Sequence, residues 1–349
     1  METWQKILQN SITPLDGLQE HVACDSNALH EVIANFPMRI NPYFLKLIRA
    51  PGDPIFKQAV PDLAEIDDTI GEDDPLAEEN LSPVPNLVHK YPDRVLFLVS
   101  HTCAMYCRFC TRKRKVGTDK MRISRKTLQA GYAYLRHHPE IREVLISGGD
   151  PLLLADCEIA EILSSLRAIR SIEIIRIGTR VPSVLPMRIT RKLVAILKAH
   201  HPLYINTHFN HPSEITAEST RACTMLANAG IPLGCQTVLL KGINDDAQIL
   251  KDLFLGLLRI RVKPYYLFQA DLTKGTNHFR TTTATGIAIM RQLYGHISGM
   301  AIPTYALDGP HGKGKIPLTP QYIMSQGDTL VFENFQGEVC TYPEAGDCC

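Results

Sequence analysis

The feature that most constrains the fold is a regular alternation of strand-like and helix-like segments from residue 94 onward. Six short runs are rich in β-branched and apolar residues, and longer stretches with apolar residues at helical spacing follow them. The runs are RVLFLVS (94–100), EVLISGG (143–149), IEIIRIG (172–178), PLYINTH (202–208), IPLGCQTVLL (231–240) and VKPYYLF (262–268). This order predicts parallel strands joined by crossover helices. Six units are too few for an eight-stranded closed barrel, so we expect an α/β fold with a partial (β/α)6 TIM-like barrel.

The segments richest in reactive and glycine residues follow the strand-like runs. They are HTCAMYCRFC, SGGDP, GTRVPS, THFNHP, KGIND and QADLTKG, in chain order. In barrels of this type, the chemistry lies on the loops at the C-terminal ends of the strands. The pattern therefore predicts an enzyme whose site lies at that face.

Two regions flank the predicted barrel. We expect residues 1–90 to form a mainly helical N-terminal extension, because WQKILQNSI and SNALHEVIANF have helical spacing. Its acidic stretch from Asp62 to Asn80 is expected to be a solvated surface segment without chemistry. The barrel is assigned to residues 91–300, and a short C-terminal segment to residues 301–349.

The composition excludes several classes of protein. Lys and Arg number 37 against 36 Asp and Glu, so no basic excess indicates nucleic-acid binding. The N-terminal residues lack the basic start, apolar run and cleavage site of a secretory signal. The longest apolar runs, such as VLFLV at 95–99, are far shorter than the ~20 residues of a membrane-spanning helix. We therefore expect a cytoplasmic protein without nucleic-acid or membrane partners.

Three cysteines spaced Cys103-x3-Cys107-x2-Cys110 form the strongest chemical motif. Thiolates are the usual ligands of iron–sulfur clusters. A structural zinc site is the alternative, but it takes four ligands and this stretch supplies three. Three thiolates on a [4Fe–4S] cluster leave one iron open to another molecule. The motif, placed just after the first strand-like run, resembles the radical SAM superfamily, in which the open iron binds S-adenosylmethionine (SAM).

A glycine turn, SGGDP, follows the second strand-like run. Paired glycines at a strand end let the backbone approach a ligand closely, and the carboxylate of Asp150 suits an ammonium partner. The same letters also suit an ordinary turn. In the radical SAM superfamily such a segment contacts the amino group of SAM. The SAM-binding residues implied by this resemblance are Ser147, Gly148, Gly149, Asp150 and His208.

Seven blocks of sequence, in the same order, resemble lysine 2,3-aminomutase, a family within that superfamily. They span roughly residues 83–320. The blocks are PVPNLVHKYPDRVLFLVSHTCAMYCRFCTRKR, SGGDPLL, RIGTRVPSVLP, NTHFNHPSE, VLLKGIND, PYYLFQADLTKGTNHFR and ALDGPHGKGKIPLTP. The resemblance implies the fold and cofactors of the family, together with site residues at matching positions.

The resemblance implies pyridoxal 5′-phosphate (PLP) as a second cofactor. In the family, the PLP-binding lysine lies in a glycine-rich segment directly before a Thr-Pro or Ile-Pro pair, and Lys315 holds that position. Lys313 is the rival, but it does not directly precede Ile316. A lysine that attacks a carbonyl needs surroundings that lower its pKa. Further PLP-binding residues implied by the resemblance are Tyr91, Arg94 and Gln236.

Substrate recognition is implied in the same way. The family places two aspartates around the distal ammonium of lysine, and Asp271 and Asp308 match them; a buried cation needs such carboxylate partners. Arg112 matches the arginine that takes the substrate carboxylate, for which a guanidinium fork is suited. The two acids favour lysine over glutamate and leave arginine open as a substrate.

One departure concerns a zinc site at a subunit contact in longer members of the family. In the turn GINDD at 242–246, an aspartate stands at the position of one cysteine ligand, and the C-terminal Cys348 and Cys349 are spaced differently. We expect no such zinc site here. A homo-oligomer stays open.

The expected activity is therefore that of an isomerase, which converts L-lysine to β-lysine by a 1,2-amino migration. An electron donor such as flavodoxin or ferredoxin is the expected protein partner. One alternative is the same chemistry supplying β-lysine to modify elongation factor P, since short members of the family without the zinc tail do so. Another is an aminomutase for a different cationic amino acid such as arginine. A third is a cysteine-rich regulatory or zinc-binding protein that retains the fold without catalysis.

Overall fold

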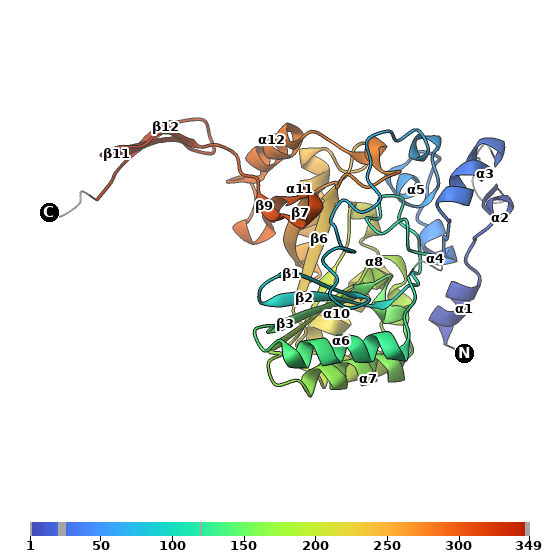
Figure 1. The fold of residues 1–349 in the computed structure, drawn as a ribbon. Helices are drawn as coiled ribbons and strands as arrows, with labels where there is room; N and C mark the ends of the chain where they lie inside the picture. The colour runs from blue at the N-terminus through green and yellow to red at the C-terminus, as the bar shows by residue number, and fades with distance from the viewer. Residues whose placement is uncertain (1, 20–25, 119–120, 346–349) are drawn as a thin grey trace.

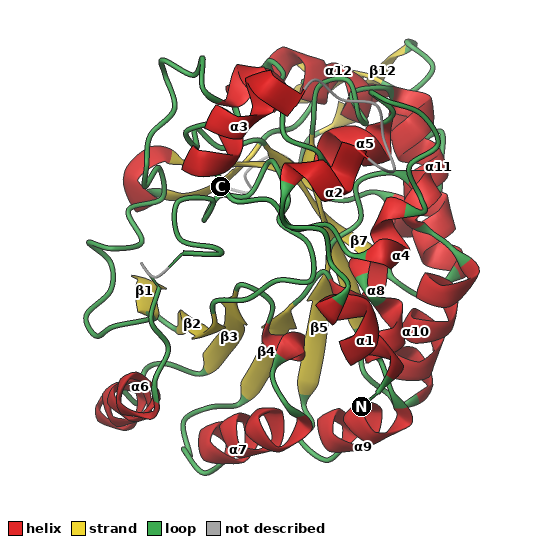
Figure 2. Cartoon of the chain, turned by 90° about the vertical axis from the view of Figure 1, so that its right-hand side faces the viewer, coloured by secondary structure: helices red, strands yellow, loops and turns green. Residues whose placement is uncertain are grey.

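A curved nine-stranded sheet forms the centre of the molecule, with its strands in chain order (Figures 1 and 2). The computed structural model describes residues 2–19, 26–118 and 121–345. The strands are β1 Leu87–Tyr91, β2 Arg94–Ser100, β3 Glu143–Gly148, β4 Ile174–Gly178, β5 Leu203–Thr207, β6 Leu233–Leu239, β7 Lys263–Gln269, β8 Thr304–Gly309 and β9 Gly314–Pro317. Strands β2 to β8 are parallel, and the edge strands β1 and β9 pair antiparallel to their neighbours. The result is a partial barrel.

This architecture confirms the predicted α/β partial barrel and all six expected strands, which are β2 to β7. The sheet also contains strands that the sequence pattern did not indicate. A seventh parallel strand, β8, follows β7, and β9 folds back on it as a hairpin that pairs Asp308 with Lys315. The other edge hairpin, β1 with β2, pairs Tyr91 with Arg94.

Helices cover the outer face of the sheet (Figure 2). They are α6 Arg125–His137, α7 Asp156–Arg167, α8 Val181–Val184, α9 Arg191–Lys198, α10 Ala217–Asn228, α11 Ala247–Arg259 and α12 Thr283–Leu293. Among these, α6, α7, α9, α10 and α11 confirm the expected crossover helices. Polar side chains start several of them; for example, the Asp246 carboxylate accepts hydrogen bonds from the backbone N–H groups of Gln248 and Ile249 at the start of α11.

Side chains along each strand point alternately to the hydrophobic core and to the barrel interior. On β3 and β4, Val144, Ile146 and Ile175 are buried in the hydrophobic cluster beneath the helices. Their neighbours Leu145 and Arg176 point to the other face and line a cavity. Because successive side chains of a strand point to opposite faces, one strand supplies both the apolar core and the interior of the barrel.

The N-terminal region packs over the loops at one end of the barrel. Its helices are α1 Thr3–Gln9, α2 Leu15–Gln19, α3 Ser26–Asn35, α4 Pro42–Leu45 and α5 Pro54–Ala59. Phe44 and Ile55 belong to a second buried cluster that also contains Met105 and Leu185, from loops that follow β2 and β4. These helices lie between Thr3 and Ala59, and the division of the chain at residue 90 stays a prediction.

Short 3-10 turns join several of these elements. They are η1 Leu63–Glu65, η2 Pro151–Leu153, η3 Pro186–Arg188, η4 Pro212–Glu214, η5 Asn277–Phe279, η6 Gly299–Ala301 and η7 Pro310–Gly312.

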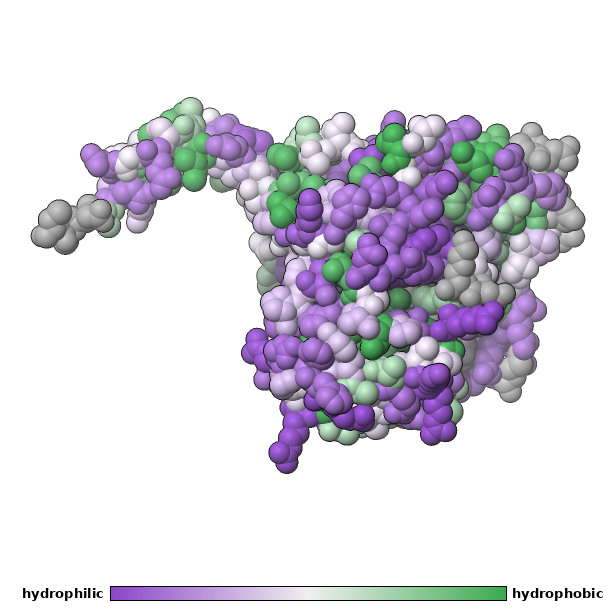
Figure 3. All heavy atoms as spheres, in the orientation of Figure 1, coloured by the Kyte–Doolittle hydropathy of each residue, from purple (hydrophilic) through white to green (hydrophobic). Residues whose placement is uncertain are grey.

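The C-terminal residues form a separate antiparallel sheet that projects from the barrel as an arm (Figures 1 and 3). Its strands are β10 Ile323–Ser325, β11 Thr329–Glu333 and β12 Val339–Pro343. Several large apolar side chains on the arm are exposed, including Met324, Val339 and Tyr342. Cys348 and Cys349 lie outside the described residues. Among the residues described, no helix has the length and apolar character to cross a bilayer.

The acidic stretch from Asp62 to Asn80 is only partly the solvated segment that its composition predicted. Glu65 is fully buried and pairs with two cations, Arg108 and Lys113. Glu78 is buried as well and pairs with Arg112. The expectation was wrong for these two residues because the cationic partners lie more than thirty residues further along the chain and only the fold brings them to these carboxylates.

Candidate active site

One cavity of about 440 Å³ lies inside the barrel, at the C-terminal ends of the parallel strands. Every site residue expected from the sequence lines it. These residues are Tyr91, Arg94, Cys103, Cys107, Cys110, Arg112, Ser147, Gly148, Gly149, Asp150, His208, Gln236, Asp271, Asp308 and Lys315. The rival lysine, Lys313, is exposed and is not among the lining residues. The fold therefore joins residues spread over more than 220 positions into one site.

The three cysteines lie on the loop between β2 and α6. Burial raises the pKa of Cys110 to about 11, and burial together with the neighbouring thiols raises the pKa of Cys103 well above its usual value. Such thiols are protonated unless a bound metal stabilises the thiolate form. In the described part of the chain, no three His, Cys, Asp or Glu side chains are grouped so as to hold a single metal ion.

The glycine turn packs against the chain that leads into the cysteine loop. The Gly149 N–H donates to the Ser100 carbonyl at 2.6 Å, and the Asp150 N–H donates to that of Thr102 at 2.7 Å. A Cβ on Gly148 would lie 2.1 Å from the Ser100 oxygen, and its φ of +134° also favours glycine. Only glycine therefore lets the end of β3 approach the cysteine loop this closely.

The Asp150 carboxylate ties the end of β3 to that of β4. It accepts hydrogen bonds from the Thr179 hydroxyl at 2.7 Å and from the Arg180 N–H at 2.8 Å. Burial raises the pKa of Asp150 to about 6, against the opposing effect of these donors. His208 also lines the cavity, and its Nε2 donates to Asn210 Oδ1. Burial together with the Arg180 charge lowers the pKa of His208 to about 3.

A second group of cavity-lining residues surrounds Lys315 and is called the lysine end below; the residues around the three cysteines are called the cysteine end. The Lys315 Nζ lies 2.9 Å from Asp308 Oδ2 and over the Phe268 ring, while Lys90 Nζ lies 3.1 Å from the other carboxylate oxygen. The Lys315 backbone N–H donates to the Tyr91 hydroxyl at 3.1 Å. The edge hairpins β1–β2 and β8–β9 thus bring a lysine, an aspartate and a tyrosine together.

Two further features complete this end. Arg94 stacks on the Tyr91 ring, with its guanidinium carbon 3.9 Å from the ring centre. Burial, and then the charge of Asp308, raises the pKa of Asp271 to about 7. Two carboxyl groups near one another in a closed space favour the binding of a cation, because a cation relieves both effects.

Arg112 is partly buried and pairs with Glu78. Its Nε donates to Glu78 Oε2 at 2.9 Å, and its Nη2 donates to Oε1 at 2.6 Å. The side of the guanidinium that carries Nη1 makes no hydrogen bond to another described residue. Glu78 therefore fixes the plane of the Arg112 guanidinium, and the edge that carries Nη1 is available to a ligand.

Sequence reasoning missed several charged residues of the cavity. Lys90 and Glu78 line it, as do Arg176 and Arg180. Arg176 carries a sequence signal, since it interrupts the apolar run IIRIG of β4. Glu78 carries none, because its acidic surroundings resemble an exposed segment.

The comparisons with known proteins point to one family. The family model described as "Radical SAM superfamily" matches residues 97–253, and "Lysine-2,3-aminomutase" matches residues 290–349. An L-lysine 2,3-aminomutase of Clostridium subterminale is 45% identical over 98% of this chain and 84% of its own length. A glutamate 2,3-aminomutase of Clostridioides difficile is 44% identical over 96% of this chain and 81% of its own.

Solved structures give a looser match. Streptococcus suis SuiB bound to its precursor peptide SuiA superimposes with a TM-score of 0.47 and 14% identity, over 67% of this chain and 51% of that one. The sequence relationships are far stronger and cover nearly the whole chain. The chain belongs to the lysine 2,3-aminomutase family of the radical SAM superfamily.

Proposed function

We propose that this protein is an L-lysine 2,3-aminomutase, an isomerase that moves the amino group of L-lysine from C2 to C3 and yields β-lysine. The observation that carries the proposal is a single cavity lined both by three free cysteines and by the Lys315–Asp308 pair. Relatives with this name cover nearly the whole chain. The cofactors of the proposed reaction are a [4Fe–4S] cluster, SAM and PLP.

The cysteine end suits a cluster and SAM. Cys103, Cys107 and Cys110 are free thiols at the cavity wall, and we assign them as the cluster ligands. The glycine turn and His208 are assigned to SAM. Neutral His208, whose Nδ1 makes no hydrogen bond to another described residue, offers an acceptor that carries no competing charge.

The lysine end suits PLP. Lys315 is assigned as the lysine that attaches the cofactor, because its amine faces the cavity beside an aromatic ring. Tyr91, stacked with Arg94, and Gln236 line the same space. When bound, the cluster with SAM supplies radical chemistry for hydrogen abstraction, and PLP supplies an electron-accepting ring for the migrating nitrogen.

The chain's own residues would bind and orient the substrate. Asp271 and Asp308 are assigned to the distal ammonium of lysine, and Arg112 to its carboxylate. The Lys315 ammonium now occupies one oxygen of Asp308; attachment of PLP through that nitrogen would free the oxygen for a substrate cation. An acidic side chain at the same place would face two carboxyl groups, which disfavours glutamate.

The reaction requires a one-electron donor of low potential, and flavodoxin or ferredoxin fits this requirement. The free cysteines of the described residues fit a reducing compartment such as the cytoplasm. The exposed apolar residues of the C-terminal arm are compatible with a homo-oligomer.

The test is an assay on anaerobically purified protein with a reconstituted cluster, PLP, SAM and a strong reductant. L-lysine, L-glutamate and L-arginine are supplied in parallel, and the β-amino acids are measured by mass spectrometry. We expect β-lysine, dependent on both SAM and PLP. Conversion of glutamate or arginine in place of lysine would contradict the assignment of Asp271 and Asp308.

A further inference from the structure

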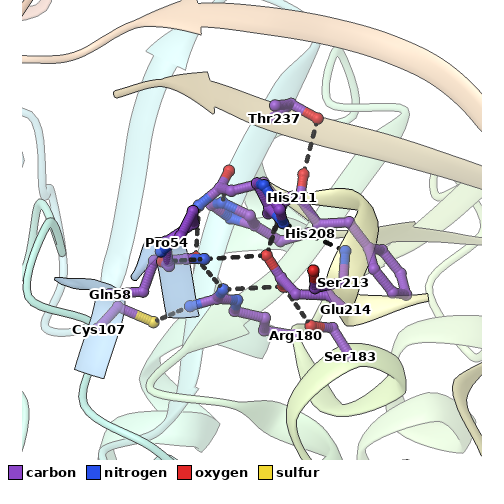
Figure 4. A network of polar contacts seen from close by, with 12 residues as sticks. Pro54, Gln58, Cys107, Arg180, Ser183, His208, His211, Ser213, Glu214 and Thr237 are labelled. Carbon is purple, nitrogen blue, oxygen red and sulfur yellow. Dashed lines mark hydrogen bonds and ion pairs between the residues drawn. The ribbon is translucent and has the colours of Figure 1, made fainter. Parts of the chain in front are cut away.

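A buried arginine that no part of the proposed reaction uses points at one of the cysteines. Arg180 follows β4, is only 8% exposed, and donates from Nη1 to the sulfur of Cys107 at 2.8 Å (Figure 4). Among the described residues, Cys107 is the one cysteine of the motif whose sulfur has such a side-chain partner. The guanidinium is always charged at physiological pH, so this contact brings a permanent cation to that sulfur.

The position of Arg180 does not depend on Cys107. Its Nη2 donates to Gln58 Oε1 at 2.5 Å and to Glu214 Oε2 at 3.0 Å. Its guanidinium also lies over the rings of Phe44 and Phe109. Partners from three separate parts of the chain therefore hold the arginine in place, and it would keep its direction when Cys107 binds a metal.

Glu214 balances the charge and is itself fully engaged. It is completely buried and accepts hydrogen bonds from the Ser183 hydroxyl at 2.6 Å and from the Gln58 amide at 3.1 Å (Figure 4). The Arg180 charge, helped by these donors, keeps the pKa of Glu214 below its usual value despite burial. The pair is therefore neutral as a whole but oriented, with its positive end toward the sulfur.

We propose that Arg180 is a positioning residue that sets the reduction potential of the cluster through its hydrogen bond to the Cys107 sulfur. The inference rests on the proposed function, because it takes Cys107 as a cluster ligand. Reduction adds one electron to the cluster, and part of that negative charge resides on the ligand sulfurs. Hydrogen bonds and positive charge at a sulfur stabilise the reduced state, and hydrogen bonding of this kind is a known control of cluster potential.

Removal of Arg180 and removal of the Glu214 charge should shift the reduction potential of the cluster in opposite directions. Loss of the Arg180 donor removes stabilisation from the reduced cluster and lowers the potential. Loss of the Glu214 negative charge leaves the Arg180 cation uncompensated and raises the potential. A role in folding alone would shift neither potential in a direction tied to charge.

The experiment is a redox titration of the reconstituted protein, followed by the electron paramagnetic resonance signal of the reduced cluster, without SAM, PLP or lysine. Arg180→Gln is expected to lower the ratio of reduced to oxidised cluster at a fixed potential about tenfold, which is about 59 mV for one electron. Glu214→Gln is expected to move the ratio the other way. Arg180→Lys keeps the charge with a different reach and should shift the potential less than Arg180→Gln.

The matched control is Arg188→Gln. Arg188 is also a fully buried arginine, paired with Asp156 and with the carbonyls of Leu152 and Leu154, and it makes no hydrogen bond to any of the described cysteines. Its potential should equal that of the unaltered protein. If Arg180→Gln does not assemble a cluster, Arg180→Lys decides the matter by its own potential.

Failure of the proposed function and failure of the proposed role of Arg180 give different results. If the unaltered protein binds no [4Fe–4S] cluster by iron content and spectrum, the proposed function and this inference both fall. If the cluster forms and the Arg180 and Glu214 variants share the potential of the unaltered protein, only the role of Arg180 is overturned.

Discussion

The two ends of the cavity use buried charge in different ways. At the cysteine end, Arg180 pairs with Glu214, and the Asp150 carboxylate accepts hydrogen bonds from the loop that follows β4. At the lysine end the charges are shared unevenly. Asp308 serves two lysines, and Asp271 stands beside it with a pKa raised to about 7.

The difference shows what each end is built to do. Matched buried pairs fix geometry, because neither partner can leave without stranding the other in a medium of low polarity. Mismatched carboxyl groups instead create a site whose charge is completed by a ligand. The cysteine end is therefore preorganised, and the lysine end is completed on loading.

The largest expected effect is the loss of one cofactor without the other, with a different cofactor lost at each end of the cavity. Lys315→Ala should abolish the visible absorbance of covalently bound PLP and leave the iron content unchanged, because Lys315 lies on β9 whereas the three cysteines lie on the loop between β2 and α6. Cys107→Ala should lose iron and keep covalent PLP. Both are measured by spectroscopy and iron analysis.

Lys313→Ala is the control for this pair of variants, since Lys313 is exposed and two residues from Lys315. It should behave like the unaltered protein. Covalent PLP retained in Lys315→Ala would show that the two ends are not divided in this way.

The next effect concerns the matched charge beside the cysteine end. Glu65→Gln should destabilise the fold by about 3–5 kcal/mol, because it strands the buried Arg108 and Lys113. Burial opposes ionisation of Glu65, yet the two cations hold its pKa below the usual range. Urea unfolding of the protein measures the change.

Glu333→Gln is the matched comparison, because the Arg291–Glu333 pair lies on the surface. It should change stability by no more than about 1 kcal/mol. Equal losses in the two variants would remove the distinction between buried and exposed pairs.

A smaller effect is expected from one carboxylate of the lysine end. Asp308→Asn should raise the KM for L-lysine about 30-fold or more, since losing a buried charged partner costs at least about 2 kcal/mol. Steady-state kinetics with β-lysine detection provides the measurement, and Lys313→Ala again serves as the control. An unchanged KM would place the substrate ammonium elsewhere.

The smallest effect is a pH dependence. A raised pKa of about 7 means that Asp271 loses its charge as the pH falls below neutrality. The binding of lysine, which needs the ionised form, should therefore weaken about tenfold from pH 8 to pH 6, following the ionised fraction.

Asp271→Asn should bind lysine more weakly at pH 8 and lose this pH dependence. The comparison is made by binding of lysine to the PLP-loaded protein at both pH values. A pH profile that survives in Asp271→Asn would assign the titration to another group.

Much of the fold was predictable because its signals are local. The strands β2 to β7 each show a short apolar run, and each is followed by a helical pattern or a reactive loop. The edge hairpin β8–β9 was missed because its residues, ALDGPHGKGKIP, are rich in glycine and carry no strand periodicity. Its strand character comes from pairing with β7, a contact between segments far apart in the chain.

The candidate site divides in the same way. The cysteine spacing and the glycine turn are short motifs, and family resemblance supplied the positions of Lys315, Asp271 and Asp308. Glu65 and Glu78 could not be recognised, because an acidic stretch looks solvated until its partners are known. The Arg180 contact with Cys107 is equally invisible, since it joins residues 73 positions apart.

The sequence by itself determined the parallel strand order, the cysteine motif and the family, because periodicity and short spacings are properties of neighbouring residues. The tertiary structure alone decided which buried charges face one another. It placed Arg180 beside Glu214 at the cysteine end and two neighbouring carboxyl groups, which favour a cationic ligand, at the lysine end. The physical reason is that the energy of a buried charge depends on partners within a few ångströms, and the fold draws those partners from distant parts of the chain.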